Sequence, residues 1–382
     1  MKRLYQILQA SLIACCALSA EFPVFAQQPE VSRALALEKQ GNADEAIAAW
    51  QVVVGADPKN ADALAHMGLL EARREHYTEA VDDYRKAFAL KPEIPGLQMN
   101  LGLALFKATR FPEAITAFTA ELHKHPNDQR LTILLGMSHY GMGDYLVAVP
   151  YLQRAATNDT ANLAIRLTLA HSCLWSKQYQ CVMDVSKEIL ALNPDSAEAD
   201  ILTGEALDEQ GDDVGATEQF RAAAKAKPRE PNVHFGLGYL LWKQSKYEEA
   251  AVEFQAELAN DPSSVQSIAY LADSWVELNK YDKAEPELKR AIAAIPTIEM
   301  AHRDLGIIYA STGRNEAAET ELKRAIELDS QDIAPHWRLA RLYQATGKKE
   351  EAKAEFAIAS KMHQQANQAL TEKVSGPPPT QP

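Results

Sequence analysis

The stretch ADALAHMGLLEARREHYTEAVDDYRKAFALKP, residues 61–92, decides the fold. It carries two small residues, Gly68 and Ala80, twelve positions apart. Small residues on two consecutive helices let the helices approach closely, because a larger side chain at either place would hold the backbones apart. Pro92 closes the stretch, and proline cannot continue a helix. The stretch therefore predicts a pair of packed helices followed by a turn.

The same pattern recurs along the chain with a constant period of about 34 residues, a length typical of stacked helical repeats. Counted from Gln27, the eighth position of each unit is glycine or alanine, and the twentieth is alanine except at Val182. Thr160 and Ser330 occupy two of the first nine closing slots, and prolines occupy the other seven: Pro58, Pro92, Pro126, Pro194, Pro228, Pro262 and Pro296. A fixed period without insertions indicates structural repeats that each contact only their neighbours.

The twenty-fourth position of the units is large and apolar, with one exception at Ser186. Its large members are Trp50, Tyr84, Phe118, Leu152, Phe220, Phe254, Leu288, Leu322 and Phe356. We expect these side chains to fill the gap toward the next repeat.

These residues make the chain resemble the tetratricopeptide repeat (TPR) family, whose pattern sets leucine-glycine, tyrosine, alanine, phenylalanine and proline at fixed offsets. The second unit matches with Leu64, Met67, Gly68, Ala80, Tyr84, Ala87 and Pro92, and the ninth with Leu305, Gly306, Tyr309, Ala318 and Ala325. The resemblance covers about residues 27–366. It implies an all-α fold, a right-handed superhelical solenoid of ten tandem helix-turn-helix repeats of about 34 residues each.

The N-terminus has the pattern of an export signal. A short positive start precedes an apolar stretch over 11–20 that is too short to span a bilayer, and Ala26 offers a cleavage site. We expect residues 1–26 to be a signal peptide and the mature chain, which has no other long apolar segment, to be periplasmic or secreted without a transmembrane segment. Alternatively, the sequence ending at Cys15 resembles a lipobox, which would anchor a lipoprotein through that cysteine.

The last part of the chain, residues 367–382, is expected to hold the end of a helix and a flexible tail. Its final residues, SGPPPTQP from Ser375 on, are too rich in proline and glycine to continue a helix.

The charge and the missing motifs restrict the function. The formal net charge is -13, and an acidic chain repels phosphate backbones, so we expect no nucleic-acid partner. No glycine-rich phosphate loop, GxSxG elbow or HExxH helix is present. We therefore expect no enzyme activity, no cofactor and no metal.

The resemblance also implies a concave groove lined by the first helix of each repeat. At its lining positions this sequence is apolar and aromatic, which favours a groove for protein or peptide partners with aromatic anchors. The candidate groove residues are Met99, Phe106, Met137, Tyr140, Leu174, Trp175, Phe235, Tyr239, Trp242, Arg303, Trp337 and Arg341. The leucines of this stripe could instead be buried between neighbouring first helices.

Two cysteines remain in the mature chain, Cys173 and Cys181. A helical hairpin can bring them within bridging distance, and export would allow oxidation. A disulfide and two free thiols both remain open from sequence.

These observations favour a non-catalytic scaffold or adaptor of the bacterial cell envelope that binds partner segments in its groove. The alternative is a non-catalytic TPR arm of an enzyme system, such as a glycosyltransferase complex with a separate catalytic subunit.

Overall fold

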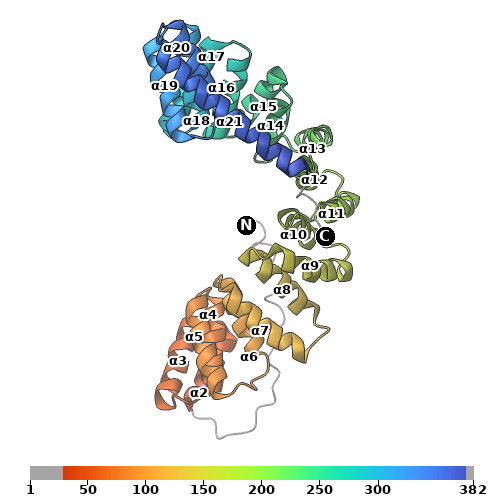
Figure 1. Ribbon diagram of the computed structural model, residues 1–382. Helices are drawn as coiled ribbons and strands as arrows, with labels where there is room; N and C mark the ends of the chain where they lie inside the picture. The colour runs from red at the N-terminus through yellow and green to blue at the C-terminus, as the bar shows by residue number, and fades with distance from the viewer. Residues whose placement is uncertain (1–28, 376–382) are drawn as a thin grey trace, which may run out of the picture. The chain divides into compact units, whose positions relative to one another are not determined.

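The computed structural model describes residues 29–375. Over those residues every regular element is an α-helix, and the twenty helices form ten consecutive pairs, which confirms the all-α repeat prediction. The expected signal peptide over 1–26, Cys15 within it, and the tail beyond residue 375 lie outside the described residues. The chain divides into two compact units, the first reaching Ala206 and the second starting at Leu207. Figure 1 shows the helices of each unit lying side by side in chain order.

The first unit contains the helices of the first five pairs and most of α12. They are α2 (Pro29–Gln40), α3 (Ala43–Ala56), α4 (Ala61–Arg73), α5 (Tyr77–Leu90), α6 (Leu97–Lys107), α7 (Phe111–Lys124), α8 (Gln129–Met142), α9 (Tyr145–Asn158), α10 (Leu163–Trp175), α11 (Tyr179–Leu192) and α12 (Ala197–Glu209). The first helices α4, α6, α8 and α10 each pack on the second helix of their own pair and on that of the preceding pair.

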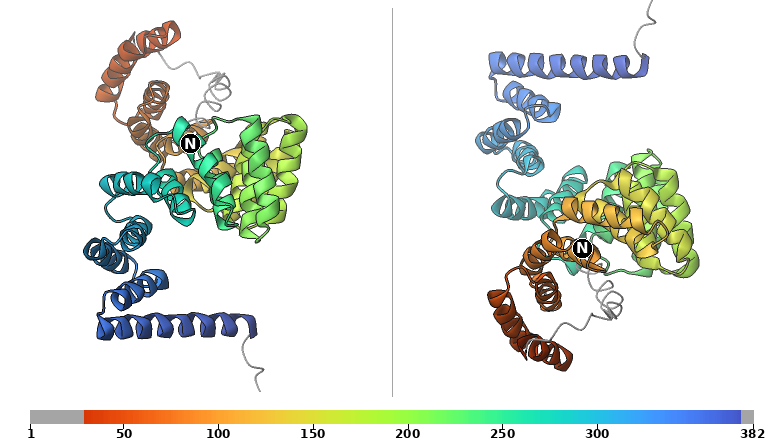
Figure 2. Two further views of the ribbon diagram at one scale, coloured as in Figure 1. Left: turned by 90° about the horizontal axis from the view of Figure 1, so that it is seen from above. Right: turned by 90° about the horizontal axis from the view of Figure 1, so that it is seen from below.

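The second unit continues the same alternation. Its helices are α13 (Asp213–Ala226), α14 (Val233–Lys243), α15 (Tyr247–Asn260), α16 (Val265–Glu277), α17 (Tyr281–Ala294), α18 (Glu299–Ser311), α19 (Asn315–Leu328), α20 (Ile333–Ala345) and α21 (Lys349–Ser375). Figure 2 shows α21 as one long helix. At 27 residues it is nearly twice as long as the other second helices, which have 14.

The turn inside each pair is built in the same way throughout. The residue two positions before the second helix has a positive φ in all ten pairs of the described chain. Glycine occupies that position in half of the pairs because it adopts this left-handed conformation without strain. In the other pairs it is Glu75, Thr109, Lys177, Ser245 or Asn279. Several first helices are also capped by a side chain, as where Asn60 accepts a hydrogen bond from the Ala63 amide at 2.9 Å.

The small eighth position makes room for the large side chain at the twenty-fourth position of the same repeat. A Cβ atom added at Gly102 would lie 2.6 Å from Cε1 of Phe118, and one added at Gly238 would lie 2.7 Å from Cε1 of Phe254. We expected these large side chains to fill the gap toward the following repeat. Both rings lie against the backbone of their own first helix. The Phe254 ring also reaches the following repeat, as expected, with its centroid 5.7 Å from that of Tyr270.

Apolar packing runs through each unit. In the first unit one core extends from Leu64 to Ala206, and a smaller cluster surrounds Trp50. In the second unit a core extends from Ile268 to Ala352. These cores hold the first helices at fixed spacings, and that spacing positions the side chains described next.

Ion pairs on the outer surface connect the second helices of neighbouring repeats. Arg221 donates to Glu249 at 2.8 Å, and Arg314 contacts both carboxylate oxygens of Glu285 at 2.8 and 2.9 Å. The hydrogen bond from Arg314 and, to a smaller extent, that from Lys289 lower the pKa of Glu285 to about 2. Exposed pairs of this kind contribute little to stability.

Candidate partner-binding surfaces

The first unit carries a group of aromatic rings that we call the Trp175 cluster, defined as Tyr140, Tyr145, His171 and Trp175. They come from the ends of α8 and α10 and the start of α9. The Trp175 ring centroid lies 4.6 Å from that of Tyr145, 5.2 Å from that of His171 and 5.7 Å from that of Tyr140. Trp175 nevertheless remains 48% exposed. A fixed, half-exposed indole can bury apolar area at little cost in side-chain entropy when a partner binds.

The Trp175 cluster has a polar side and an apolar side. His171 Nε2 lies 3.0 Å from Glu198 Oε1. Burial, assisted by the neighbouring Tyr145 and Glu198, raises the pKa of Tyr140 to about 12, so its hydroxyl stays neutral and can donate a hydrogen bond. Next to Tyr145 in the chain, three large apolar side chains are exposed: Met142, Leu146 and Val147. Exposed apolar side chains gathered in this way are typical of contact surfaces.

The second unit carries another aromatic group, the Trp242 cluster, defined as Phe235, Tyr239, Trp242, Phe254 and Tyr270. Tyr270 on α16 stands edge-on to Phe235, Tyr239 and Trp242 on α14, with ring centroids 5.8, 5.6 and 5.1 Å apart. The cluster therefore spans two successive first helices. Burial raises the pKa of the Tyr270 hydroxyl.

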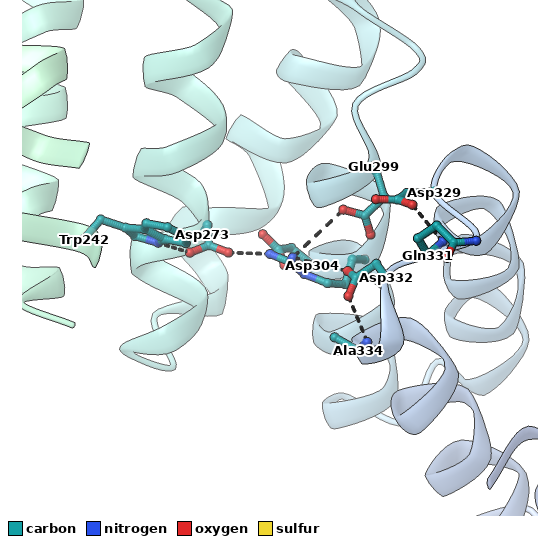
Figure 3. A network of polar contacts seen from close by, with 9 residues as sticks. Trp242, Asp273, Glu299, Asp304, Asp329, Gln331, Asp332 and Ala334 are labelled. Carbon is teal, nitrogen blue, oxygen red and sulfur yellow. Dashed lines mark hydrogen bonds and ion pairs between the residues drawn. The ribbon is translucent and has the colours of Figure 1, made fainter. Parts of the chain in front are cut away.

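A polar network continues from this cluster onto the next first helices (Figure 3). The Trp242 indole donates to Asp273 Oδ2, and Arg303 Nη2 donates to Asp273 Oδ1 at 2.7 Å. Arg303 Nε also donates to Asp304 Oδ1 at 3.0 Å. Two further carboxylates, those of Glu299 and Asp332, lie 4.0 and 3.9 Å from Arg303 Nη1. One guanidinium therefore faces four carboxyl groups.

Burial favours the protonated form of two of the carboxyl groups around Arg303. Burial raises the pKa of Asp304, whose side chain is only 1% exposed, well above its usual value. Burial also raises the pKa of Glu299 to about 6, although the charge of Arg303 acts in the other direction. Ionisation of Glu299 therefore adds a negative charge to this network as the pH rises through about 6.

The acidic run on α12 and α13 is partly neutralised within the second unit. Lys243 Nζ lies 2.7 Å from both Asp208 Oδ1 and Asp213 Oδ1, and these two contacts raise the pKa of Lys243. Asp212 caps α13 by accepting from the Gly215 amide at 2.9 Å.

The other predicted groove residues divide into buried and exposed groups. Phe106, Met137 and Leu174 are less than a tenth exposed and belong to the core of the first unit. Met99 is partly buried against the same core. Trp337 on α20 is 38% exposed and packs on Phe356 of α21 at 5.4 Å, and Arg341 of the same helix is exposed. The three predicted tryptophans, which lie on separate repeats, all keep part of their surface accessible: Trp175, Trp242 and Trp337.

Sequence reasoning missed several members of these surfaces. Tyr145 was overlooked although an aromatic residue begins six of the second helices: Tyr77, Phe111, Tyr145, Tyr179, Tyr247 and Tyr281. That recurrence is visible in the sequence and could have identified it. Asp304 and Glu299 were also missed, because nothing in the pattern distinguishes a buried carboxyl group on a first helix from an exposed one.

The structure joins Cys173 of α10 to Cys181 of α11 in a disulfide, with Cα atoms 5.8 Å apart. Across residues 29–375, no set of three or more histidine, cysteine, aspartate or glutamate side chains is placed to hold a metal ion. Nor does any helix in that range have the length and apolar character to cross a membrane.

The helices are paired and repeat every ~34 residues, and in several pairs an aromatic ring packs directly on a glycine of the first helix. These features define a helical repeat protein of the scaffold type. Family models agree with this class. The model described as "Tetratricopeptide repeat" matches residues 31–95, 99–163, 187–231 and 215–265, and the model described as "TPR repeat" matches residues 306–347. The chain belongs to the tetratricopeptide repeat family, whose members serve as scaffolds for protein interaction.

Similar proteins of known name are distant. The protein CTR9 homolog of Arabidopsis thaliana is 21% identical over 259 residues, which cover 65% of this chain and 24% of that protein. The BBSome complex member BBS4 of Bos taurus is 22% identical over 216 residues, which cover 56% of this chain and 42% of that protein. The chain thus spans less than half the length of these relatives.

Among solved structures, the C-terminal part of a TPR repeat-containing protein from Cytophaga hutchinsonii matches with a TM-score of 0.50 at 16% identity, covering 63% of this chain and 98% of that one. The Cut9–Hcn1 hetero-tetramer of the APC/C matches with a TM-score of 0.47 at 15% identity, covering 77% of this chain and 58% of that one. At these identities the likeness concerns the fold alone.

Proposed function

We propose that this protein is a non-catalytic scaffold of the bacterial cell envelope that binds extended segments of partner proteins along its first helices. The observation that carries the proposal is the Trp175 cluster, a set of stacked rings with a half-exposed indole at its edge. A core that only needed filling would bury this ring, as it buries Trp50.

The two surfaces favour partner segments of different chemistry. The Trp175 cluster, flanked by exposed Met142, Leu146 and Val147, suits an apolar or aromatic segment. The Trp242 cluster adjoins the carboxyl groups around Arg303, and above pH 6 these carry more negative charge than the guanidinium balances. A segment with an apolar side chain followed by a lysine or arginine fits that surface.

Site-directed crosslinking in the native envelope tests the proposal. A photo-reactive amino acid at Leu146 or Tyr239 should capture the same partners in successive preparations. The double variant Trp175→Ala plus Trp242→Ala should lose at least nine tenths of that capture, since truncating a central aromatic anchor costs about 2 kcal/mol or more.

The matched control removes apolar side chains of similar exposure from the second helices. Val52→Ala plus Val252→Ala changes side chains that are 58% and 61% exposed on α3 and α15. We expect this control to capture partners as the unchanged protein does. Equal loss in both double variants, or no loss in the tryptophan variant, would refute binding along the first helices.

Export from the cytoplasm is part of the proposed function, and cell fractionation tests it directly. N-terminal sequencing of the mature protein should find Gln27 first. Recovery of a lipid-modified Cys15 would instead show an anchored lipoprotein, and an intact N-terminus in the cytoplasm would refute export.

A further inference from the structure

The fifth repeat lacks the large apolar side chain that the other repeats carry at the twenty-fourth position. At the twenty-fourth position, where Phe118 and Leu152 are fully buried in the preceding repeats, it has Ser186. The Ser186 hydroxyl is buried and has no hydrogen-bond partner among the described residues. The eighth position is Ala170 rather than glycine. Here α10 and α11 are instead joined covalently by the Cys173–Cys181 disulfide.

The disulfide encloses the residue that carries the proposed binding surface. Trp175 lies two residues after Cys173, inside the short loop that the bond closes. The same loop contains Lys177, which holds the left-handed turn conformation (φ 59°) without being glycine. Backbone hydrogen bonds from Lys177 to Leu174 and from Gln178 to Cys173, at 2.9 and 2.8 Å, complete the turn. Among non-glycine residues this conformation is costly, although Glu75, Thr109, Ser245 and Asn279 hold it in repeats without a disulfide.

One of the two sulfur atoms can be reached from outside. Cys173 is fully buried, whereas Cys181 is only partly buried and lines a surface cavity of about 790 Å³. Leu169, Arg166 and Val185 line the same cavity. A thiol reductant entering the cavity therefore meets Cys181 first.

We propose that the Cys173–Cys181 disulfide is a redox-responsive device that positions Trp175 for partner binding. The closed bond holds the C-terminal turn of α10, and with it the Trp175 cluster, in the binding arrangement. Reduction releases the turn and weakens binding at this surface of the first unit. The inference rests on the proposed function, because it concerns the control of that same surface.

The reduction is an ordinary thiol–disulfide exchange with a dithiol. A thiolate of the dithiol attacks Cys181 Sγ, the sulfur–sulfur bond breaks, and Cys173 leaves as a thiolate that takes up a proton. The second thiolate of the dithiol then attacks the mixed disulfide, which releases Cys181 and leaves the reagent as a cyclic disulfide. Two electrons pass from the dithiol to the two cysteines.

Hydrogen exchange on the full mature chain tests the positioning step without any partner. Dithiothreitol should increase amide exchange at least tenfold in the peptide spanning 173–181. The corresponding peptide of the third repeat, 105–113, contains no member of the Trp175 cluster, should be unchanged and serves as the internal control. The variant Cys181→Ser, which alters only the partly exposed cysteine, should exchange as the reduced protein does. Unchanged exchange at 173–181 on reduction, or alkylation of both cysteines without reductant, would overturn the inference.

Partner capture tests the consequence and separates the two proposals. Reduction should lower crosslinking from Leu146 at least fivefold while leaving crosslinking from Tyr239 in the second unit unchanged. A rescue variant, Ala170→Gly plus Ser186→Leu in the Cys181→Ser background, copies the Gly136–Leu152 pair and should restore slow exchange and capture under reduction. If Trp175→Ala abolishes capture from Leu146 but reduction does not reduce it, the redox inference fails and the proposed function stands. If Trp175→Ala has no effect, the proposed function itself fails.

Discussion

Replacing Gly102 by alanine tests whether the ring at the twenty-fourth position needs the missing Cβ. The new methyl group would lie 2.6 and 2.8 Å from two carbons of the Phe118 ring and 3.3 Å from Ala117 Cβ. Inserting a methyl group into such a close-packed site costs about 1–3 kcal/mol. Alanine gains back up to about 1 kcal/mol over glycine from helix propensity. We therefore expect a net loss of about 0–2 kcal/mol.

A second glycine isolates the packing cost. Gly55 lies in α3, where an added Cβ would meet nothing within 4 Å. Gly55→Ala should therefore show only the gain in helix propensity, which is small near the end of a helix. The changes in the free energy of unfolding of the two variants should differ by about 1–3 kcal/mol. Adding Phe118→Leu to Gly102→Ala should recover most of the lost stability. Leucine is smaller than phenylalanine, and Leu152 occupies the same position in the next repeat.

The measurement has to be local, because repeat arrays need not unfold in one step. Hydrogen exchange of peptides from α6 and α7 reports the opening free energy of the third repeat, and urea unfolding gives the whole-chain midpoint. The reasoning would be refuted if the opening free energy of the third repeat were the same in Gly102→Ala as in Gly55→Ala. The Phe118 ring would then not require a glycine beneath it.

Three further predictions concern charges. Burial raises the pKa of Glu299 from 4.5 to about 6, so the folded state holds this proton more tightly than the unfolded state. The free energy of unfolding should therefore fall by at most about 2 kcal/mol as the pH rises through that window. Glu299→Gln should abolish this part of the pH profile measured by urea unfolding. Burial favours the protonated form of Asp304, so Asp304→Asn should cost less stability at pH 7 than Arg303→Met. The second change leaves the Asp273 carboxylate with the Trp242 indole as its remaining donor and should cost about 3–5 kcal/mol. Equal losses in both variants would contradict this order. Arg314→Met should leave the urea midpoint unchanged, because this pair is exposed to solvent; a clear shift would show that the ion pairs between second helices stabilise the array.

The fold could be predicted from the sequence because its cause is local and repeated. Gly68, Ala80 and Pro92 each impose one constraint on the backbone, and the recurrence of such constraints in phase along the chain leaves a single arrangement of helices. What the pattern did not reveal is the direction of the large side chains. Phe118 can face its own repeat or the next one at the same sequence spacing, and only the close approach to Gly102 decides between them.

The candidate surfaces were only partly predictable. Trp175 and Trp242 were identified because indole rings stand out at lining positions, but Phe106 and Leu174 occupy equivalent positions and pack into the core instead. Exposure on a first helix depends on the curvature and neighbours of that particular repeat, and a periodic pattern carries no information about either. The charge state of Asp304 depends on burial in the same way.

The fit between glycine and ring has a consequence for how such a chain can change its length. Gly102 and Phe118 belong to one repeat. A duplication or deletion of that whole repeat therefore moves the glycine and the ring that packs on it together. Phe220 is different, since its ring lies against Gly236 of the following repeat, where an added Cβ would be 2.3 Å away. The Phe111 ring of the third repeat likewise lies against Gly141 of the fourth, where an added Cβ would be 2.6 Å away. Recombination inside this family should therefore disfavour breakpoints that separate the third repeat from the fourth or the sixth from the seventh.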